Sequence, residues 1–384
     1  MRVMGAVKDY KHFERMVTSY KPFNVNLNKM KWVGEVPLLK SGEKMKLITP
    51  PVSMKMMLDL LDKDAYHYAC VDAISEACFV KFECKNKDVN NFINNIQLPE
   101  QDDVISIFSD FIHYYIATGN GFLLKMRNMT GQWVGLNRLI PNEVQIVENI
   151  DSYGFLRPDY IQVAGGKKAF FKGKDIVHML QRTSMSNAWG MACKSIILCI
   201  ETLHEINAYD YNRFKNGLLL DYFIIIEGGN FGQKYKDDNG NDVDPFVELE
   251  LLLQKAKGNN NSHRTILIES SDPGSKVRLE PMRVDDNNFE SLKKDLRESV
   301  VIYHRVPKRL IGLQTPGQLG GDNNSDMVIF YNMVVKPIQE RVAFILSKEF
   351  KKEFGWDVNP KDFSFGDISE VMDSFENKLL RDAI

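Results

Sequence analysis

Residues 285–324 read DDNNFESLKKDLRESVVIYHRVPKRLIGLQTPGQLGGDNN, and this segment is the most informative one in the chain. A helix is predicted over residues 287–304, because Asn287 and Glu290 have the spacing of a capping box. Apolar side chains then recur every three or four positions, as on one face of a helix. They are Phe289, Leu292, Leu296 and Val300. Charged residues fill the opposite face, so that face should meet water or a polar neighbour.

The helix should end at Arg305-Val306-Pro307-Lys308-Arg309. Pro307 disfavours a helical conformation at the residue before it and cannot continue the helical hydrogen bonds. The following residues, 312–324, contain four glycines and few apolar side chains, so we expect a mobile loop. A second helix should follow, capped by Asp322 or Asn324 and kinked at Pro337.

Upstream of this segment, the sequence predicts an α+β lobe and a long helix. Helices are expected at 66–79 and at 104–118, the latter closed by Gly119. Strands are expected at 122–127, 133–139 and 144–147, in a hairpin from 160 to 171, and at a sheet edge over 176–180. Apolar residues at near-helical spacing predict a helix over 191–215, closed by Gly217. Strands at 218–226, 265–269 and 277–279, with a short helix started by Asp244-Pro245, should lie between the two long helices.

A long loop without a nucleophile, general base or set of metal ligands is unusual for an enzyme and suits a mechanical part. Arg305-Val306-Pro307, Leu310-Ile311-Gly312, the glycine-rich run and residues 330–337 resemble the C-terminal signature of tailed-phage portal proteins, in particular the PBSX-type capsid portal subfamily. Matching segments recur at 119–122, 136–141, 175–178 and 189–190, so the resemblance covers about residues 46–350.

The resemblance implies an α+β portal-type fold that assembles as a ring. Its expected parts are an N-terminal arm (1–46), an α+β wing (47–190), two stem helices (191–216 and 285–305), a small αβ clip (217–284), a tunnel loop (306–325), a long kinked helix (326–350) and a C-terminal segment that is a short crown or a wing extension (351–384). The stem helices should pack antiparallel through Leu203, Ile206, Leu292 and Leu296. The clip should include Asp221, Tyr222 and Asp242.

Composition limits the classes of function. A chain of 384 residues exceeds one compact core, so two or more lobes are expected. Lys and Arg number 49 against 51 Asp and Glu, which argues against holding nucleic acid by bulk neutralisation of phosphates. Five cysteines without a CxxC pair support neither a disulfide framework nor a zinc ribbon. No signal peptide and no apolar run of about 20 residues is found, so we expect a soluble intracellular protein without membrane contact.

Three sequence motifs partly resemble known chemical sites. A Walker A sequence is excluded because Gly166 and Gly173-Lys174 are wrongly spaced and Asp175 follows where Ser or Thr is needed. The acidic turn 237–244 places Tyr235 and Phe246 at positions where a calcium loop needs carboxylates, which favours an Asn-Gly hairpin. Cys199 with His204 is too few ligands for a metal.

Asp285 and Asp286 suggest helix caps more than a nuclease pair. We therefore expect no catalytic, cofactor-binding or metal-binding residue, and no enzyme activity. The basic pair Lys308 and Arg309 is by itself an ordinary surface feature, but a ring would repeat it once per subunit around a channel.

The resemblance implies a portal ring, usually of twelve subunits, at one capsid vertex. Its expected partners are the major capsid protein, the terminase large subunit, a neck or adaptor protein and the double-stranded DNA that passes through for packaging, retention and ejection. Its expected place is the virion, with the host cytoplasm during assembly. The expected DNA-facing residues are Lys308, Arg309, Gln314, Gln318, Asn323 and Asn324. The alternative is a DNA-processing enzyme or subunit with an unrecognised active site, which predicts a small oligomer where the portal predicts a large closed ring.

Overall fold

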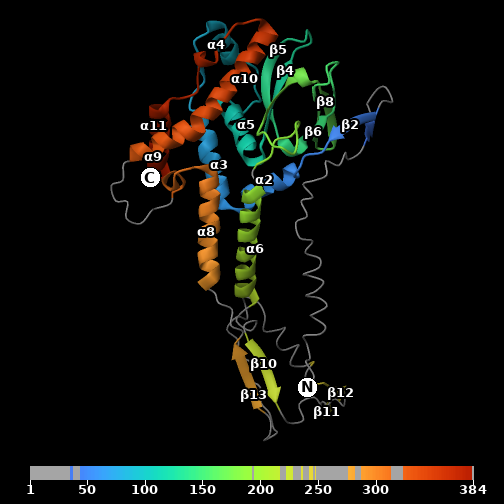
Figure 1. Ribbon diagram of the computed structural model, residues 1–384, viewed down its shortest axis with the longest axis vertical. Coiled ribbons are helices and arrows are strands. Elements are labelled where there is room, and N and C mark those ends of the chain that lie inside the picture. The colour runs from blue at the N-terminus through green and yellow to red at the C-terminus, as the bar shows by residue number, and fades with distance from the viewer. Residues whose placement is uncertain are drawn as a thin grey trace. The chain divides into compact units, whose positions relative to one another are not determined.

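Figure 1 shows the computed structural model of the chain. The structure describes residues 35–37, 44–192, 194–216, 222–227, 235–236, 242–244, 247, 276–281, 287–312 and 323–382. The chain divides into two compact units, of which unit 1 contains Met1–Cys193 and His304–Ile384, and unit 2 contains Lys194–Tyr303. The two lobes expected from length are thus present, and the second is inserted into the first.

The helices of the first half of unit 1 surround one long central helix. They are α2 (Met54–Lys63), α3 (Ala65–Cys78), α4 (Lys87–Asn94) and the central α5 (Val104–Thr118). A capping box between Asp103 and Ser106 begins α5, and Gly119 ends it in the left-handed conformation with φ 79°. The predicted end at Gly119 is therefore confirmed, whereas α4 was not predicted.

Unit 1 has two larger antiparallel sheets, and the smaller of these two packs against α5. The smaller has the strand order β5-β4-β9, and its strands are β4 (Asn120–Arg127), β5 (Trp133–Leu139) and β9 (Ile176–Leu180). The larger has the order β1-β2-β6-β7-β8, and its strands are β1 (Glu35–Pro37), β2 (Lys44–Ile48), β6 (Val144–Val147), β7 (Asp159–Ala164) and β8 (Lys167–Phe171). In Figure 1 the smaller sheet lies between α10 and the larger sheet. The expected arm boundary at residue 46 is wrong, because β2 begins at Lys44 and pairs with β6.

The core between the sheets is closed by a tight backbone contact. The side-chain amide of Asn120 donates to the carbonyl of Gly190 at 3.0 Å and its oxygen accepts from Gly190 N at 2.7 Å. A Cβ on Gly190 would collide with the carbonyl oxygen of Gly119, so this approach requires glycine. The neighbouring Trp189 is buried in the core and donates from Nε1 to the carbonyl of Ile48 at 2.7 Å.

The C-terminal part of unit 1 is one long helical run followed by a return to the first half. The run contains α9 (Asn323–Phe330), the π-helical turn η6 (Tyr331–Val335) and α10 (Lys336–Phe354), so it ends beyond the expected residue 350. Pro337 lacks an amide hydrogen, and the π-helical turn directly before it accommodates that loss. The 3₁₀ turn η7 (Pro360–Asp362), β14 (Phe363–Ser364) and α11 (Ile368–Asp382) follow.

This C-terminal segment is part of unit 1. Strand β14 pairs with the short β3 (Glu83–Cys84). The amide of Gln339 donates to the carbonyls of Cys78 at 3.2 Å and Gly366 at 3.1 Å, which ties α10, α3 and the C-terminal segment together.

Two buried histidines join α3 to the last residue of α8 (Asn287–His304). His67 Nδ1 and His304 Nε2 lie 2.9 Å apart, and the two residues are 1% and 5% exposed. One of these two nitrogens must donate and the other must accept, and the second ring nitrogen of His67, Nε2, is buried without a hydrogen-bond partner among the described residues. Burial is the main cause that lowers the pKa of His67 to about 4 and that of His304 to about 3, and the charge of a neighbouring histidine lowers each further.

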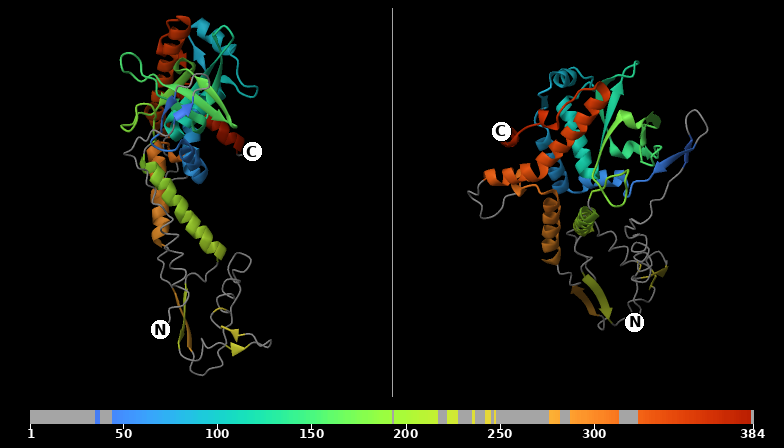
Figure 2. Two further views of the ribbon diagram at one scale, coloured as in Figure 1. Left: turned by 90° about the vertical axis from the view of Figure 1, so that its right-hand side faces the viewer. Right: turned by 45° about the horizontal axis from the view of Figure 1, so that its top comes forward.

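The described part of unit 2 contains two long helices and two short antiparallel strand pairs. Figures 1 and 2 show α6 (Lys194–Asn216) and α8 next to each other and running in opposite directions. Strand β10 (Tyr222–Glu227) pairs with β13 (Lys276–Pro281), and β11 (Tyr235–Lys236) pairs with β12 (Asp242–Val243). The helix over 287–304 is thus confirmed. Strands β11 and β12 pair on either side of residues 237–241 of the expected Asn-Gly hairpin, and these residues lie outside the described ones. Residues 217–221, 245–246 and 265–269, where other elements were expected, lie outside the described residues.

The expected stem residues differ in burial. Leu203 and Ile206 on α6 are 3% and 7% exposed. Leu296 on α8 is partly buried, whereas Leu292 is 40% exposed, so its expected buried position is wrong for the single chain.

The reason for this exposure lies in the side of α8 that meets α6. Lys293 forms an ion pair with Asp210, and Phe289 contacts the Tyr209 ring at 5.8 Å between centroids. Because successive residues are about 100° apart around a helix of 3.6 residues per turn, Leu292 lies about 60° from Phe289 and about 100° from Lys293, at the edge of the side that meets α6.

We expect Leu203→Asp to lower the free energy of unfolding by about 2–5 kcal/mol, because a carboxylate would replace a buried apolar side chain. The matched change Leu292→Asp should cost about 0.5 kcal/mol or less in the unassembled chain. Urea unfolding of both variants measures the difference, and equal losses would contradict the assigned burial.

The buried histidines predict acid sensitivity. Each unfolded histidine binds a proton below its ordinary pKa of about 6.5, whereas the folded His67 and His304 resist protonation down to about 4 and 3. Their contribution to stability should therefore be complete above pH 6.5 and be lost progressively as the pH falls below it. Urea midpoints measured between pH 7 and pH 4.5 report this loss of stability. In the double variant His67→Gln, His304→Gln, the midpoint should depend less on pH. An unchanged slope in that double variant would disprove the assignment.

Candidate functional site

The basic corner, residues 304–312, begins where α8 ends. Arg305 follows with φ 56° and is the non-glycine residue with positive φ in the described part of the chain. Val306 is 4% exposed, and Pro307 then starts the 3₁₀ turn η5 (Lys308–Ile311). The predicted end of the helix before Pro307 is confirmed, with the reversal of the chain taking place at Arg305.

The corner presents its two cations on a short rigid turn. Lys308 is partly buried and Arg309 is exposed. Gly312 ends η5 in the left-handed conformation with φ 76°, and its amide donates to the carbonyl of Arg309 at 3.1 Å. Because Val306 and His304 are buried on either side of Arg305, the turn is anchored to unit 1 at its base.

The remaining expected channel residues fall into two groups. Gln314 and Gln318 lie outside the described residues. Asn323 and Asn324 are the first two residues of α9, so they belong to a helix and not to the expected loop 306–325. The expected loop 306–325 is therefore wrong at both of its ends, because residues 308–311 near its start form a 3₁₀ turn. Short 3₁₀ turns and helix ends are set by hydrogen bonds with neighbouring residues, which glycine content alone does not show.

The expected clip residues lie on or near two strand ladders. Tyr222 is the first residue of β10 and is opposite Pro281 of β13. Asp242 begins β12, is exposed and is opposite Lys236. Asp221 lies outside the described residues.

No metal centre emerges from the described ranges. Within them, no three His, Cys, Asp or Glu side chains come together as metal ligands. None of the helices searched there is long and apolar enough to cross a membrane.

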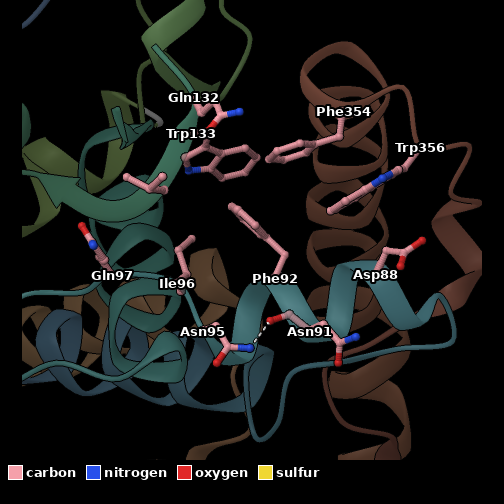
Figure 3. A pocket seen from close by; sticks show the side chains of 11 residues that line it. Asp88, Asn91, Phe92, Asn95, Ile96, Gln97, Gln132, Trp133, Phe354 and Trp356 are labelled. Carbon is pink, nitrogen blue, oxygen red and sulfur yellow. Dashed lines mark hydrogen bonds between the residues drawn. The ribbon is translucent and has the colours of Figure 1, made fainter. Parts of the chain in front are cut away.

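An open aromatic pocket between α4, β5 and the end of α10 was not predicted (Figure 3). Its volume is about 600 Å³. Phe92 points between Trp133, Phe354 and Trp356, and lies edge-on to Trp133 and Trp356. Phe354 and Trp356 stack at 4.4 Å between centroids. Polar side chains surround the aromatic wall, and they are Asp88, Asn91, Asn95, Gln97 and Gln132.

A buried ion network holds the α10 wall of this pocket in place. Lys125 on β4 is fully buried and pairs with Glu349 and Glu353. Arg127 pairs with the same Glu353 at 2.7 Å and with Asp175 at 2.6 Å. Hydrogen bonding to Arg127 and then to Lys125 outweighs burial and lowers the pKa of Glu353 to about 2. Because two cations share Glu353, the last turn of α10 is fixed against β4 and cannot slide along it without breaking both pairs.

The sequence carried one signal for this pocket. Phe350, Phe354 and Trp356 follow each other at short intervals, which is a concentration of aromatic area near a helix end. Their partners Phe92 and Trp133 are far away in sequence, so the pocket itself depends on tertiary packing.

The comparisons with known proteins agree with this architecture. No family model matches the chain. A "Probable portal protein" of Escherichia phage P2 is 23% identical over 301 residues, which cover 77% of this chain and 78% of that protein.

Two similar solved structures are chains of gene transfer agent particles. One, from the virion of the native particle, has a TM-score of 0.58 at 17% identity and covers 88% of this chain and 91% of its own. The other is from the neck of the native particle computed with C12 symmetry. It has a TM-score of 0.56 at 19% identity and covers 82% of this chain and 84% of its own. The sequence relative and the shared fold confirm the predicted relationship to the phage portal protein family, and the narrower PBSX-type assignment stays a prediction.

Proposed function

We propose that this chain is a portal subunit that assembles with further copies into the ring-shaped channel at one capsid vertex. The observation that carries the proposal is the sequence relationship to a phage portal protein over more than three quarters of both chains. The fold supports it, because chains with this fold occur in particle necks that have ring symmetry. In the proposed role the protein is a structural channel and not an enzyme.

The charge of the chain suits a channel through which DNA must slide. The net charge is -2, so the protein as a whole does not attract phosphate strongly. The corner adds Lys308 and Arg309 at one defined place, on a turn anchored by buried Val306. In a ring these cations would form a narrow basic belt, and each phosphate contact would be weak enough to break and re-form as DNA moves.

We further propose that the two ladders of unit 2 face the proteins that dock on the ring. Strands β10 and β13 form a two-stranded sheet, which leaves edges open to other strands in the described part of unit 2. Such edges accept strands from a neighbouring subunit or a partner. The proposed partners are the terminase large subunit and the neck or adaptor protein, with the major capsid protein around the ring.

The mass of the purified protein tests the proposal. A closed ring of about twelve copies should have a mass more than ten times the 44.2 kDa of one chain. Size-exclusion chromatography with light scattering measures this mass. A monomer or small oligomer with metal-dependent nuclease activity would instead support a DNA-processing enzyme.

The segment 313–322 is expected to face the DNA, because it joins the basic corner to α9. Shortening it should leave the ring mass unchanged and reduce the yield of DNA-filled particles. Gln318→Cys should be labelled more slowly in DNA-filled than in empty particles, whereas Asp242→Cys on β12 should be labelled equally in both. Equal labelling of both cysteines in the two kinds of particle would remove the channel assignment.

A further inference from the structure

Unit 1 carries an exposed aromatic turn in the connection from β6 to β7, which we call the aromatic knuckle (residues 150–157). Tyr153 is 84% exposed and Phe155 is 65% exposed. Single exposed apolar residues are common on proteins, but two large rings in one short turn form a patch that is typical of interaction sites.

The knuckle is rigidly built. Its base is closed by an antiparallel bridge between Ile150 and Leu156. The carboxylate of Asp151 accepts hydrogen bonds from the amides of Tyr153 at 3.0 Å and Phe155 at 2.8 Å, and it pairs with Arg157 at 3.2 Å. These bonds hold the backbone so that both rings stay in water, where they add nothing to the core. A preorganised aromatic surface loses little conformational entropy on binding.

The aromatic pocket offers a complementary surface. Its volume of about 600 Å³ lies within the range of about 300–1,000 Å³ that is usual for binding sites. Phe92, Phe354 and Trp356 are only partly buried there, so part of each ring remains exposed to further aromatic contacts at the pocket. Asp88 is exposed at the rim, and Arg157 at the end of the knuckle is 72% exposed although it pairs with Asp151, so an exposed cation on one surface can face an exposed anion on the other.

The two surfaces cannot meet within one copy. In Figure 1 the pocket elements α4, β5 and α10 lie on one side of unit 1, while β6, whose end carries the knuckle, lies on the other side of the smaller sheet. Two different, complementary surfaces on one chain make a head-to-tail contact between copies, and such contacts close into rings when the rotation fits.

We propose that Tyr153 and Phe155 of one copy insert into the aromatic pocket of the next copy around the ring. The inference rests on the proposed ring function and names the residues that make one of its contacts between subunits. Arg157 of the first copy then lies near Asp88 of the second, which adds electrostatic selection of the correct partner face.

Cysteine cross-linking tests the contact in the assembled full-length chain. A chain with both Tyr153→Cys and Asn91→Cys should give a ladder of dimers, trimers and larger species under oxidation, because each copy joins its two neighbours. Either single variant should give no ladder. The control pair Met129→Cys with Asn91→Cys places an equally accessible cysteine, 106% exposed, on another loop and should give none.

A second experiment measures how strongly the contact stabilises the ring. Tyr153→Ser with Phe155→Ser should raise the concentration at which the ring dissociates by about tenfold or more, as loss of central aromatic contacts does. Met129→Ser should leave that concentration unchanged. Both changes are on the surface, so the circular dichroism of the chain should not alter.

The outcomes separate the contact from the function. The knuckle contact is disproved if the serine variant forms a ring as stable as the wild type and the Tyr153→Cys, Asn91→Cys chain gives no ladder. The proposed portal function would remain in that case. A wild-type chain that forms no ring overturns the proposed function. A serine variant that keeps the ring but fails only to enter capsids would show that the knuckle binds another protein, and the inference would be wrong.

Discussion

The hydrogen bonds between Asn120 and Gly190 form the constraint on which the rest of unit 1 depends. They bring the start of β4 against the last residues before α6, at a distance that only glycine at 190 permits. Gly119 sits in the same contact, because its carbonyl accepts from Gln181 N at 2.7 Å. The end of α5, the edge strand β9 and the residues before α6 are therefore held by the Asn120 side-chain amide and a few backbone atoms around it. A side chain at either glycine would separate all three.

The chain returns to unit 1 through an equally confined place. His304 is buried against His67, Arg305 reverses the backbone, and Val306 is buried directly after it. The basic corner thus directly follows the first buried residues of the returning segment of unit 1. Because its cations follow two buried residues on a short 3₁₀ turn, their backbone positions are set by the core and not by the adjoining loop.

The aromatic pocket and the ion network behind it show how unit 1 combines rigidity with an open surface. Lys125 and Arg127 fix the end of α10 through Glu353, while Phe354 and Trp356 at that end remain partly open. Burying these cations is favourable only because carboxylates on α10 and near β9 satisfy them. The network therefore fixes the register between helix and sheet, and the rings on the adjoining turn are left for contacts outside the chain.

Elements whose signals are local could be predicted from the amino-acid sequence. The bounds of α8, the end of α5 at Gly119, and strands β5, β6 and β9 follow from caps, proline and glycine positions, and apolar repeats within a few residues. The portal resemblance was likewise readable from short motifs. Helix α4 escaped detection because KDVNNFIN has only three apolar residues and is stabilised from outside, through its Asn86 cap and buried Val89 and Ile93.

Only the tertiary structure decided which of these elements meet. The β14 and β3 pairing, the His67 and His304 contact, and the pocket of Phe92, Trp133 and Trp356 each join residues that are distant in sequence. It also decided that Leu203 is buried while Leu292 is exposed, although both lie on predicted apolar faces. A helical repeat shows that a face is apolar, but burial is the area that a second element removes from water, and that depends on where the second element lies.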